Sequence, residues 1–383
     1  MTDRAATRRR GRRSRWWAVP LVLGLPVVAV VAVGLAAPYL PPRPYWWAQL
    51  AAIALPYAAW ALGAVAAVWL AGRQWALGAL AVVLVGAVAV RAGALDRLST
   101  PEPGDDDLVV VTFNVPEVGP SREALGDSVV RFVRAAAPDV VSLQDAWVPG
   151  AGSDRQQAIQ VEAVVGALPY ALAVPARVAG HPGWRSNSTG VPQMVREGAG
   201  VEVVDQEALV LGVERDADVS LALRTHLRWR GRDAVLYNVH LRSFGEAKPW
   251  ADADFRWTTP ATWLPYLRRY RTAYAQRGDD VEEIARRVEG EVYPVVVMGD
   301  FNSTADNWTY RRLRTAGADR TDAFQAVGGW RWGRTYRADR PFVRIDYVLA
   351  DPAFEVTSAR TAPTTFSDHR PVRVTLRWRE PAP

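Results

Sequence analysis

Three long uncharged segments follow a cluster of arginines at the start of the chain, and they strongly limit what this region can fold into. They cover residues 16–40, 45–72 and 74–90, and the third is the shortest. Roughly 20 apolar residues cross a bilayer, whereas the apolar part of a signal peptide has only roughly 7–15. The pattern predicts a basic cytoplasmic head over 1–15 and a membrane region over 16–95 with about three transmembrane helices.

Charge is distributed unevenly between this region and the rest of the chain. Residues 1–104 hold 11 arginines against three carboxylates, whereas the remaining residues hold 35 basic against 37 acidic groups. The positive-inside rule keeps the arginine head in the cytoplasm, so three spans predict that the large domain lies outside the cell. If the third segment does not cross, that domain faces the cytoplasm. The near-neutral balance after residue 104 disfavours a domain built mainly to grip nucleic acid.

Beyond a polar linker over 96–107, strands and helices alternate. Short β-branched or alternating segments predict strands, and apolar residues at helical spacing predict helices. Paired strands among helices favour two packed sheets with helices outside. The expected strands are Leu108–Val115, Asp139–Gln144, Glu207–Val213, Ser220–Arg230, Ala234–Leu241, Pro294–Gly299, Arg344–Ala350, Phe354–Thr361 and Val372–Trp378. The expected helices are Arg122–Ala137, Arg155–Leu168, Ala261–Val288 and Trp308–Ala316.

Polar side chains gather where these strands begin or end. They are Asn114, Asp145, Asn238, His240, Asp300, Asn302, Arg344, Asp346, Asp368 and His369. Hydrolysis of a phosphate ester needs oxygen ligands for a hard cation, amides that hold non-bridging oxygens, and an imidazole that moves a proton. This set supplies all three. The other two histidines, His181 and His226, have no such context, so we interpret them as structural. The chain has no cysteine, which excludes thiolate metal sites and a cysteine nucleophile.

Taken in order, these segments resemble the endonuclease/exonuclease/phosphatase superfamily. The blocks are Thr-Phe-Asn-Val at Asn114, Pro-Asp-Val-Val-Ser-Leu-Gln-Asp at 138–145, Tyr-Asn-Val-His-Leu at 237–241, Val-Met-Gly-Asp-Phe-Asn at 297–302, Arg-Ile-Asp-Tyr-Val at 344–348 and Ser-Asp-His-Arg-Pro-Val at 367–372. The resemblance covers about 108–379. It implies a four-layer β-sandwich of two packed mixed sheets flanked by helices, and a metal-dependent hydrolase.

The resemblance also implies a role for each matching residue. Asn114 and Asp145 would lie at the principal Mg²⁺ site, and Asp368 would help to bind the metal or orient its neighbours. Asp300 and Asn302 would orient the attacking water and stabilise the phosphoryl oxygens. His369, held by Asp346, would be the general base or a donor to the transition state. His240 would contact phosphate or protonate the leaving group. Asn238 and Arg344 are the candidates for binding substrate. Whether Asp300 or His369 removes the proton from water stays open.

One position departs from the family pattern. The family places glutamate after Leu-Gln as the main metal ligand, whereas this chain has Asp145. The carboxylate is kept but is one methylene shorter, and Mg²⁺ tolerates distorted geometry poorly. We expect an active site with an adjusted metal shell, in which Mn²⁺ or Ca²⁺ could replace Mg²⁺. The alternative is a catalytically silent binding or scaffold domain.

The expected activity is that of a membrane-anchored phosphoesterase, which cleaves a phosphodiester or phosphomonoester by in-line attack of an activated water. The membrane segments and the near-neutral domain favour a lipid head group or an extracellular nucleotide as substrate. An extracellular nuclease that scavenges nucleic acid is the alternative. Nothing in the sequence indicates a protein partner. Aromatic residues are dense between Phe244 and Tyr274, and those at helical spacing are expected to pack in the core. Whether the less regular part, Phe244–Trp257, also packs or forms a lip that faces lipid or an apolar substrate stays open.

Overall fold

The computed structural model describes residues 21–22, 24–94, 101–115, 122–146, 159–172, 177–179, 190–212, 220–245, 249, 254–256, 258–328 and 333–380. The predicted arginine head, Trp16, Trp17, part of the 96–107 linker, His181, Trp250 and Trp257 lie outside the described residues. The chain forms two compact units. One comprises Met1–Leu95 with the short segment Asp306–Trp308, and the other contains the remaining residues.

The described residues between 21 and 94 form apolar helices of the first unit. The helix Gly24–Tyr39 ends in a 3₁₀ turn, η1 (Ala37–Tyr39), and is followed by α2 (Pro42–Ala71) and α3 (Trp75–Arg91). Tyr45 interrupts the regular geometry near the start of α2. Of the described helices, only α2 is long and apolar enough to cross a membrane; the other two are shorter apolar helices. At about 1.5 Å per residue, the 17 residues of α3 extend about 25 Å, less than the roughly 30 Å of a bilayer core.

The second unit contains a six-stranded mixed sheet. Its central strands β1 and β2 are parallel, and the outer pairings are antiparallel. β1 and β2 are almost wholly buried, which explains their run of valine, leucine and phenylalanine. In spatial order the strands are β12 (Phe354–Thr361), β13 (Val372–Trp378), β1 (Leu108–Asn114), β2 (Val140–Gln144), β5 (Gln193–Arg196) and β3 (Tyr170–Leu172).

A seven-stranded mixed sheet packs against the first. β8 and β9 are parallel neighbours at its centre, and β11 is antiparallel to β9. In spatial order the strands are β10 (Thr321–Asp322), β11 (Asp346–Ala350), β9 (Val295–Asp300), β8 (Arg232–His240), β7 (Ser220–Trp229), β6 (Val201–Leu211) and β4 (Arg177–Ala179).

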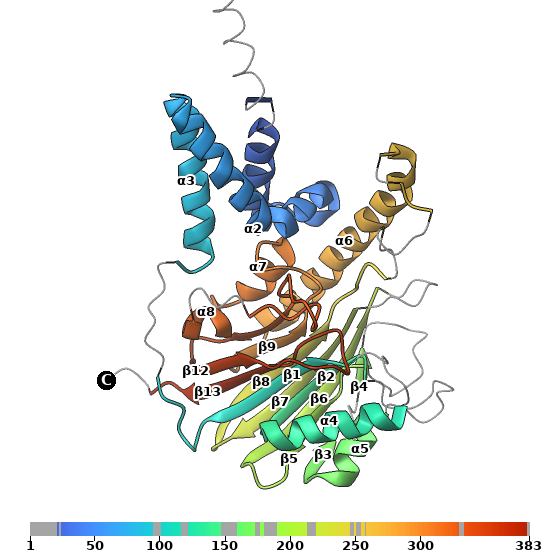
Figure 1. Cartoon of the computed structure of the whole chain (residues 1–383). Coiled ribbons are helices and arrows are strands. Elements are labelled where there is room, and N and C mark those ends of the chain that lie inside the picture. The colour runs from blue at the N-terminus through green and yellow to red at the C-terminus, as the bar shows by residue number, and fades with distance from the viewer. Residues whose placement is uncertain are drawn as a thin grey trace, which may run out of the picture. The chain divides into compact units, whose positions relative to one another are not determined.

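Helices cover the outer faces of this sandwich (Figure 1). α4 (Arg122–Ala136) and α5 (Ile159–Ala167) pack on β1 and β2 through a cluster that includes Phe113, Val129 and Val164. α6 (Pro260–Glu289) lies over the other sheet, where its Arg287 pairs with Glu207 of β6. The other helices among the described residues of this unit are α7 (Trp308–Arg314), whose first residue belongs to the first unit, and α8 (Ala323–Gly328). The predicted fold, two packed mixed sheets flanked by helices, is confirmed.

The predicted bounds of helices and strands differ from the structure mainly where the spacing of apolar residues was irregular or too short to repeat. β6 begins at Val201, six residues before the expected start, because the adjacent valines at 203–204 break the alternation of apolar and polar residues, at a β-bulge in the strand. β3, β4, β5, β10 and α8 were not predicted. Each has six residues or fewer, too few to show a period.

Candidate functional site

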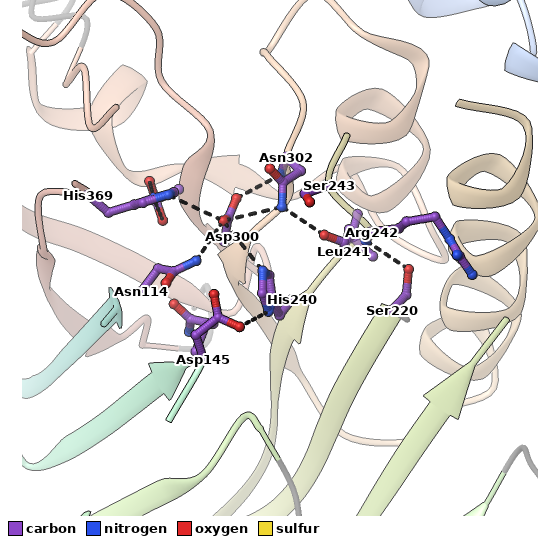
Figure 2. A network of polar contacts seen from close by, with 12 residues as sticks. Asn114, Asp145, Ser220, His240, Leu241, Arg242, Ser243, Asp300, Asn302 and His369 are labelled. Carbon is purple, nitrogen blue, oxygen red and sulfur yellow. Dashed lines mark hydrogen bonds and ion pairs between the residues drawn. The ribbon is translucent and has the colours of Figure 1, made fainter. Parts of the chain in front are cut away.

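Strand register brings the predicted polar residues to one rim of the sandwich. His240 ends β8 and lies opposite Asp300, the last residue of β9, while Asp346 opens β11 opposite the same Asp300. In the other sheet Asn114 ends β1, and its amide nitrogen donates to Oδ2 of Asp300 at 2.9 Å. Residues from both sheets therefore meet at Asp300 (Figure 2).

His369 lies in the turn before β13 and is buried beside two carboxylates. Its Nδ1 is 3.0 Å from Oδ2 of Asp346, and its Nε2 is 3.8 Å from Oδ2 of Asp300. The turn is tied to β1, because Ser367 Oγ donates to the carbonyl of Asn114 at 2.7 Å and accepts from the His369 amide at 3.0 Å. Asp346 thereby orients the ring so that Nε2 faces Asp300.

Burial and charge act in opposite directions on these groups. Burial by itself lowers the pKa of His369, but Asp346 and Asp300 outweigh it and raise the pKa to about 10. Burial raises the pKa of Asp300 above its ordinary value, against the opposing effect of His369. An imidazole with carboxylates on two sides is stabilised in its charged form, which donates from both ring nitrogens.

Asp145 and His240 form the more open side of the site. Asp145 follows β2 in a left-handed conformation (φ 55°), and its side chain is 38% exposed. His240 connects the two carboxylates, with Nδ1 3.4 Å from Oδ1 of Asp145 and Nε2 3.8 Å from Oδ2 of Asp300. A carboxylate that is reachable from solvent and next to buried polar groups is suited to bind a cation.

Two oxygens near these residues fit a hard cation. Oδ1 of Asn114 and Oδ1 of Asp368 are buried, and neither accepts a hydrogen bond in the described part of the chain. Buried acceptors normally have a partner, so these are candidates for metal coordination. The ligand atoms of Asp300, Asp346 and His369 also cluster within 4.8 Å. There, however, Nδ1 of His369 is already engaged by Asp346, so we favour the predicted set of Asn114, Asp145 and Asp368.

The turn after β9 depends on two unusual backbone conformations. Gly299 has φ 134° and lies against β8, where a Cβ would be 1.9 Å from the carbonyl oxygen of Val239. Asn302 is left-handed at φ 46°; its backbone nitrogen donates to Oδ1 of Asp300 at 2.8 Å, and its Nδ2 donates to the carbonyl of Leu241 at 2.8 Å. The Gly-Asp-Phe-Asn block therefore holds the Asp300 carboxylate in one orientation.

The two predicted substrate-binding residues are occupied inside the fold. Nδ2 of Asn238 donates to the carbonyls of Leu143 and Val191 at 2.9 and 3.0 Å, and its Oδ1 accepts from Gln144 at 2.6 Å. Asn238 is completely buried between the sheets. Arg344 makes a bidentate pair with Asp322, both bonds 2.8 Å long. These contacts give both residues structural roles, so the structure does not bring them to the rim for substrate.

Two residues that the sequence analysis missed touch the site. The ring of Tyr336 lies 5.1 Å from that of His369, in an irregular segment with no periodic signal. Arg277 of α6 is fully buried and donates to the carbonyl of Asn302 at 2.6 Å. The sequence could have indicated Arg277, because a charged residue at this position lies on the apolar face of the helix. Tyr274, Val281 and Ile284 on the same face are also buried.

Comparison with known proteins adds a family match. The model of the Endonuclease/Exonuclease/phosphatase family matches residues 111–369. An endonuclease/exonuclease/phosphatase from Bacteroides vulgatus is 20% identical, with a TM-score of 0.47 over 71% of this chain and 99% of that chain. The human Nocturnin catalytic domain is 16% identical, with a TM-score of 0.47 over 72% of this chain and 96% of that chain. A Bacteroides thetaiotaomicron mannosyl-6-phosphatase is 17% identical, with a TM-score of 0.45 over 71% of this chain and 100% of that chain. No curated protein matches the chain.

Proposed function

Because the chain belongs to the endonuclease/exonuclease/phosphatase family, it is a hydrolase of phosphoric ester bonds, and we propose that it is a membrane-anchored, metal-dependent phosphoesterase. The observation that carries the proposal is the meeting of Asp300, the His369–Asp346 pair and His240 at one rim, beside Asn114 and Asp145, whose side-chain oxygens could bind a cation. This set can orient a water, donate to phosphoryl oxygens and bind a cation.

The metal assignment rests on oxygen donors. Asn114, Asp145 and Asp368 would hold a divalent cation, with Mg²⁺ expected and Mn²⁺ or Ca²⁺ as alternatives. When bound, it would neutralise phosphoryl charge as a Lewis acid. The shorter side chain of Asp145 is compatible with this role because hard cations often bind through one carboxylate and several waters.

Three side chains of the protein can carry out the remaining steps of hydrolysis. Asp300 is held by the Asn302 amide and by Asn114, so its carboxylate can orient the attacking water and accept its proton. His369, with Nδ1 engaged by Asp346, can donate from Nε2 to a phosphoryl oxygen in the transition state. His240 can contact the phosphate or protonate the leaving group.

The substrate we favour is a lipid head group or an extracellular nucleotide, either a phosphodiester or a phosphomonoester. Residues after 104 have nearly balanced charge, which does not favour a long polyanion. An apolar helix of membrane-spanning length in the same chain supports action close to a membrane.

Hydrolysis by the purified full chain tests the activity. Substrates would be bis(p-nitrophenyl) phosphate, phospholipids, nucleotides, inositol phosphates and DNA, each with Mg²⁺, Mn²⁺, Ca²⁺ or EDTA. We expect metal-dependent turnover that falls about 100-fold or more in Asp300→Ala and His369→Ala. His226→Ala is the matched control, because His226 also pairs with an aspartate (Asp233, 2.9 Å) but has no place at the rim. Preference for DNA would favour a nuclease, and silence of a folded sample with every metal would favour a scaffold.

We further propose a multi-pass cell-membrane protein with a cytoplasmic N-terminus and the catalytic domain outside. The arginines at 4, 8, 9, 10, 12, 13 and 15 keep the N-terminus inside by the positive-inside rule. The external location then requires all three apolar helices to cross, and the 17 residues of α3 stand at the lower end of the range that spans a bilayer. Protease added to intact cells should degrade the catalytic domain. Complete protection in intact cells, with digestion after lysis, would contradict the external location.

A further inference from the structure

Arg277 of α6 joins the two strand ends that carry His240 and Asp300. Its Nε donates to the carbonyl oxygen of Arg242 at 2.7 Å, two residues after β8 ends. Its Nη1 donates to the carbonyl oxygen of Asn302 at 2.6 Å, two residues after β9 ends. One guanidinium group from a covering helix therefore holds both turns at once.

No carboxylate of the described residues contacts this buried arginine, although Asp300 and Asp280 lie near enough to act on its charge. It is fully inaccessible to solvent, and none of the ion pairs among the described residues includes it. Its nearest polar contacts are two carbonyls and Oγ of Ser303 at 3.2 Å, while the rings of Phe244 and Tyr274 lie 4.9 and 5.2 Å from its central carbon. An unpaired buried charge is costly, so contacts of this kind must offset a penalty that an apolar residue would avoid.

The turn that Arg277 holds is one that needs support. Asn302 has a left-handed backbone, which is uncommon outside glycine and persists where its surroundings enforce it. The same residue donates its backbone amide to Oδ1 of Asp300 and its side-chain amide to Leu241. A change in the orientation of Asn302 would therefore release the Asp300 carboxylate and loosen the link to the end of β8.

The end of β8 is held from the same helix in a second way. Asp280, one turn beyond Arg277, accepts a hydrogen bond from Oγ of Ser220 at 2.6 Å. That hydroxyl accepts from the backbone nitrogen of Arg242 at 3.0 Å (Figure 2). Both the amide and the carbonyl of Arg242 are therefore fixed by this region. α6 thus sets the position of the segment that follows His240.

We propose that Arg277 is a positioning residue for phosphoester hydrolysis, which acts through Asn302 and Arg242 to keep Asp300 and His240 in register. The inference rests on the proposed function and deepens it. Its hydrogen bonds go to backbone carbonyls and Ser303 rather than to the groups proposed to react, so it is not a catalytic residue. The forked guanidinium is required because its two principal bonds start from different nitrogens and end on different turns, whereas a lysine ammonium is a single point donor.

Steady-state kinetics of the full chain in detergent, with bis(p-nitrophenyl) phosphate and Mg²⁺ or Mn²⁺, tests the role. Arg277→Lys should lower kcat about 10- to 100-fold and leave KM within about threefold, because misplaced groups lose rate rather than binding. Arg320→Lys is the matched control. Arg320 is equally buried and donates to the carbonyls of Leu313 and Ala316 near the end of α7. Equal loss of kcat in both variants would overturn the proposal, since it would reflect general destabilisation.

Amide hydrogen exchange gives a readout that does not need activity. Arg277→Lys should speed exchange in 240–243 and 300–303 and leave α4 unchanged, whereas Arg320→Lys should not affect those two segments. If the wild-type chain hydrolyses no ester with any metal, but Arg277→Lys still speeds exchange in 240–243 and 300–303, the proposed function is refuted. The structural role of Arg277 in holding the two turns is then kept. Unchanged exchange in both segments with kcat within twofold of wild type would refute the positioning role.

Discussion

Replacing Gly299 by alanine should separate the two central strands that carry His240 and Asp300. A Cβ at this position would lie 1.9 Å from the carbonyl oxygen of Val239 and 2.7 Å from its nitrogen, whereas such contacts essentially never fall below 3.0 Å. Relief requires about 1 Å of movement between β8 and β9. The φ of 134° adds strain for any residue with a side chain.

The expected loss of stability combines these two effects. Overpacking typically costs about 1–3 kcal/mol, and unfavourable backbone conformation adds about 1–3 kcal/mol. A total near 4 kcal/mol should lower the thermal midpoint of the catalytic unit by roughly 8–16 °C. Differential scanning calorimetry measures this shift, and ester hydrolysis below the midpoint reports the effect on the site.

Gly290→Ala is the matched control for this experiment. Gly290 ends α6 with φ −85°, and the nearest atom to an added Cβ lies at an ordinary 3.5 Å. We expect its midpoint within about 2 °C of wild type, as for a substitution without a steric conflict. If Gly299→Ala unfolds at the same temperature as Gly290→Ala and keeps its activity, the argument from close strand approach is refuted.

Three further results are expected. Asp346→Asn should reduce kcat about 100-fold or more, because the amide cannot stabilise a charged His369; near-normal kcat would contradict the orienting role. Arg344→Met should cost about 3–5 kcal/mol in chemical denaturation, because it leaves the buried Asp322 carboxylate without its counter-charge, and a loss below 1 kcal/mol would argue against this pair. EDTA should abolish turnover and added Mn²⁺ restore it; hydrolysis that survives dialysis against EDTA would count against the metal.

The sequence predicted long helices and strands well, because they contain enough residues for the spacing of apolar side chains to repeat. The helix expected over Ala261–Val288 is observed over Pro260–Glu289, and the two last strands match their expected bounds. A proline at the start and Gly290 at the end mark that helix. β10 has only two residues, and no periodic pattern can reveal it.

The sequence predicted the site residues well where polar residues stand at strand ends. It predicted them less well where the distance of a residue from the rim determines whether its side chain reaches the site. Asn238 shares the strand of His240 but lies two residues, or about 6.6 Å, further from the rim, among the carbonyls between the sheets. The alternation of side chains along a strand shows which face of the sheet a residue occupies, but not how far the residue lies from the rim. Arg277 was missed for a related reason, because its partners are backbone carbonyls from two distant segments.

The hydrogen bonds of Asn238 have a consequence for how such a domain can diverge. The site has half its members on each sheet, and hydrophobic contact between the sheets is non-directional. Asn238 and Gln144 connect the sheets by directional bonds that resist sliding. Loops at the rim can therefore change in length and composition, while these hydrogen bonds keep the two halves of the candidate site aligned.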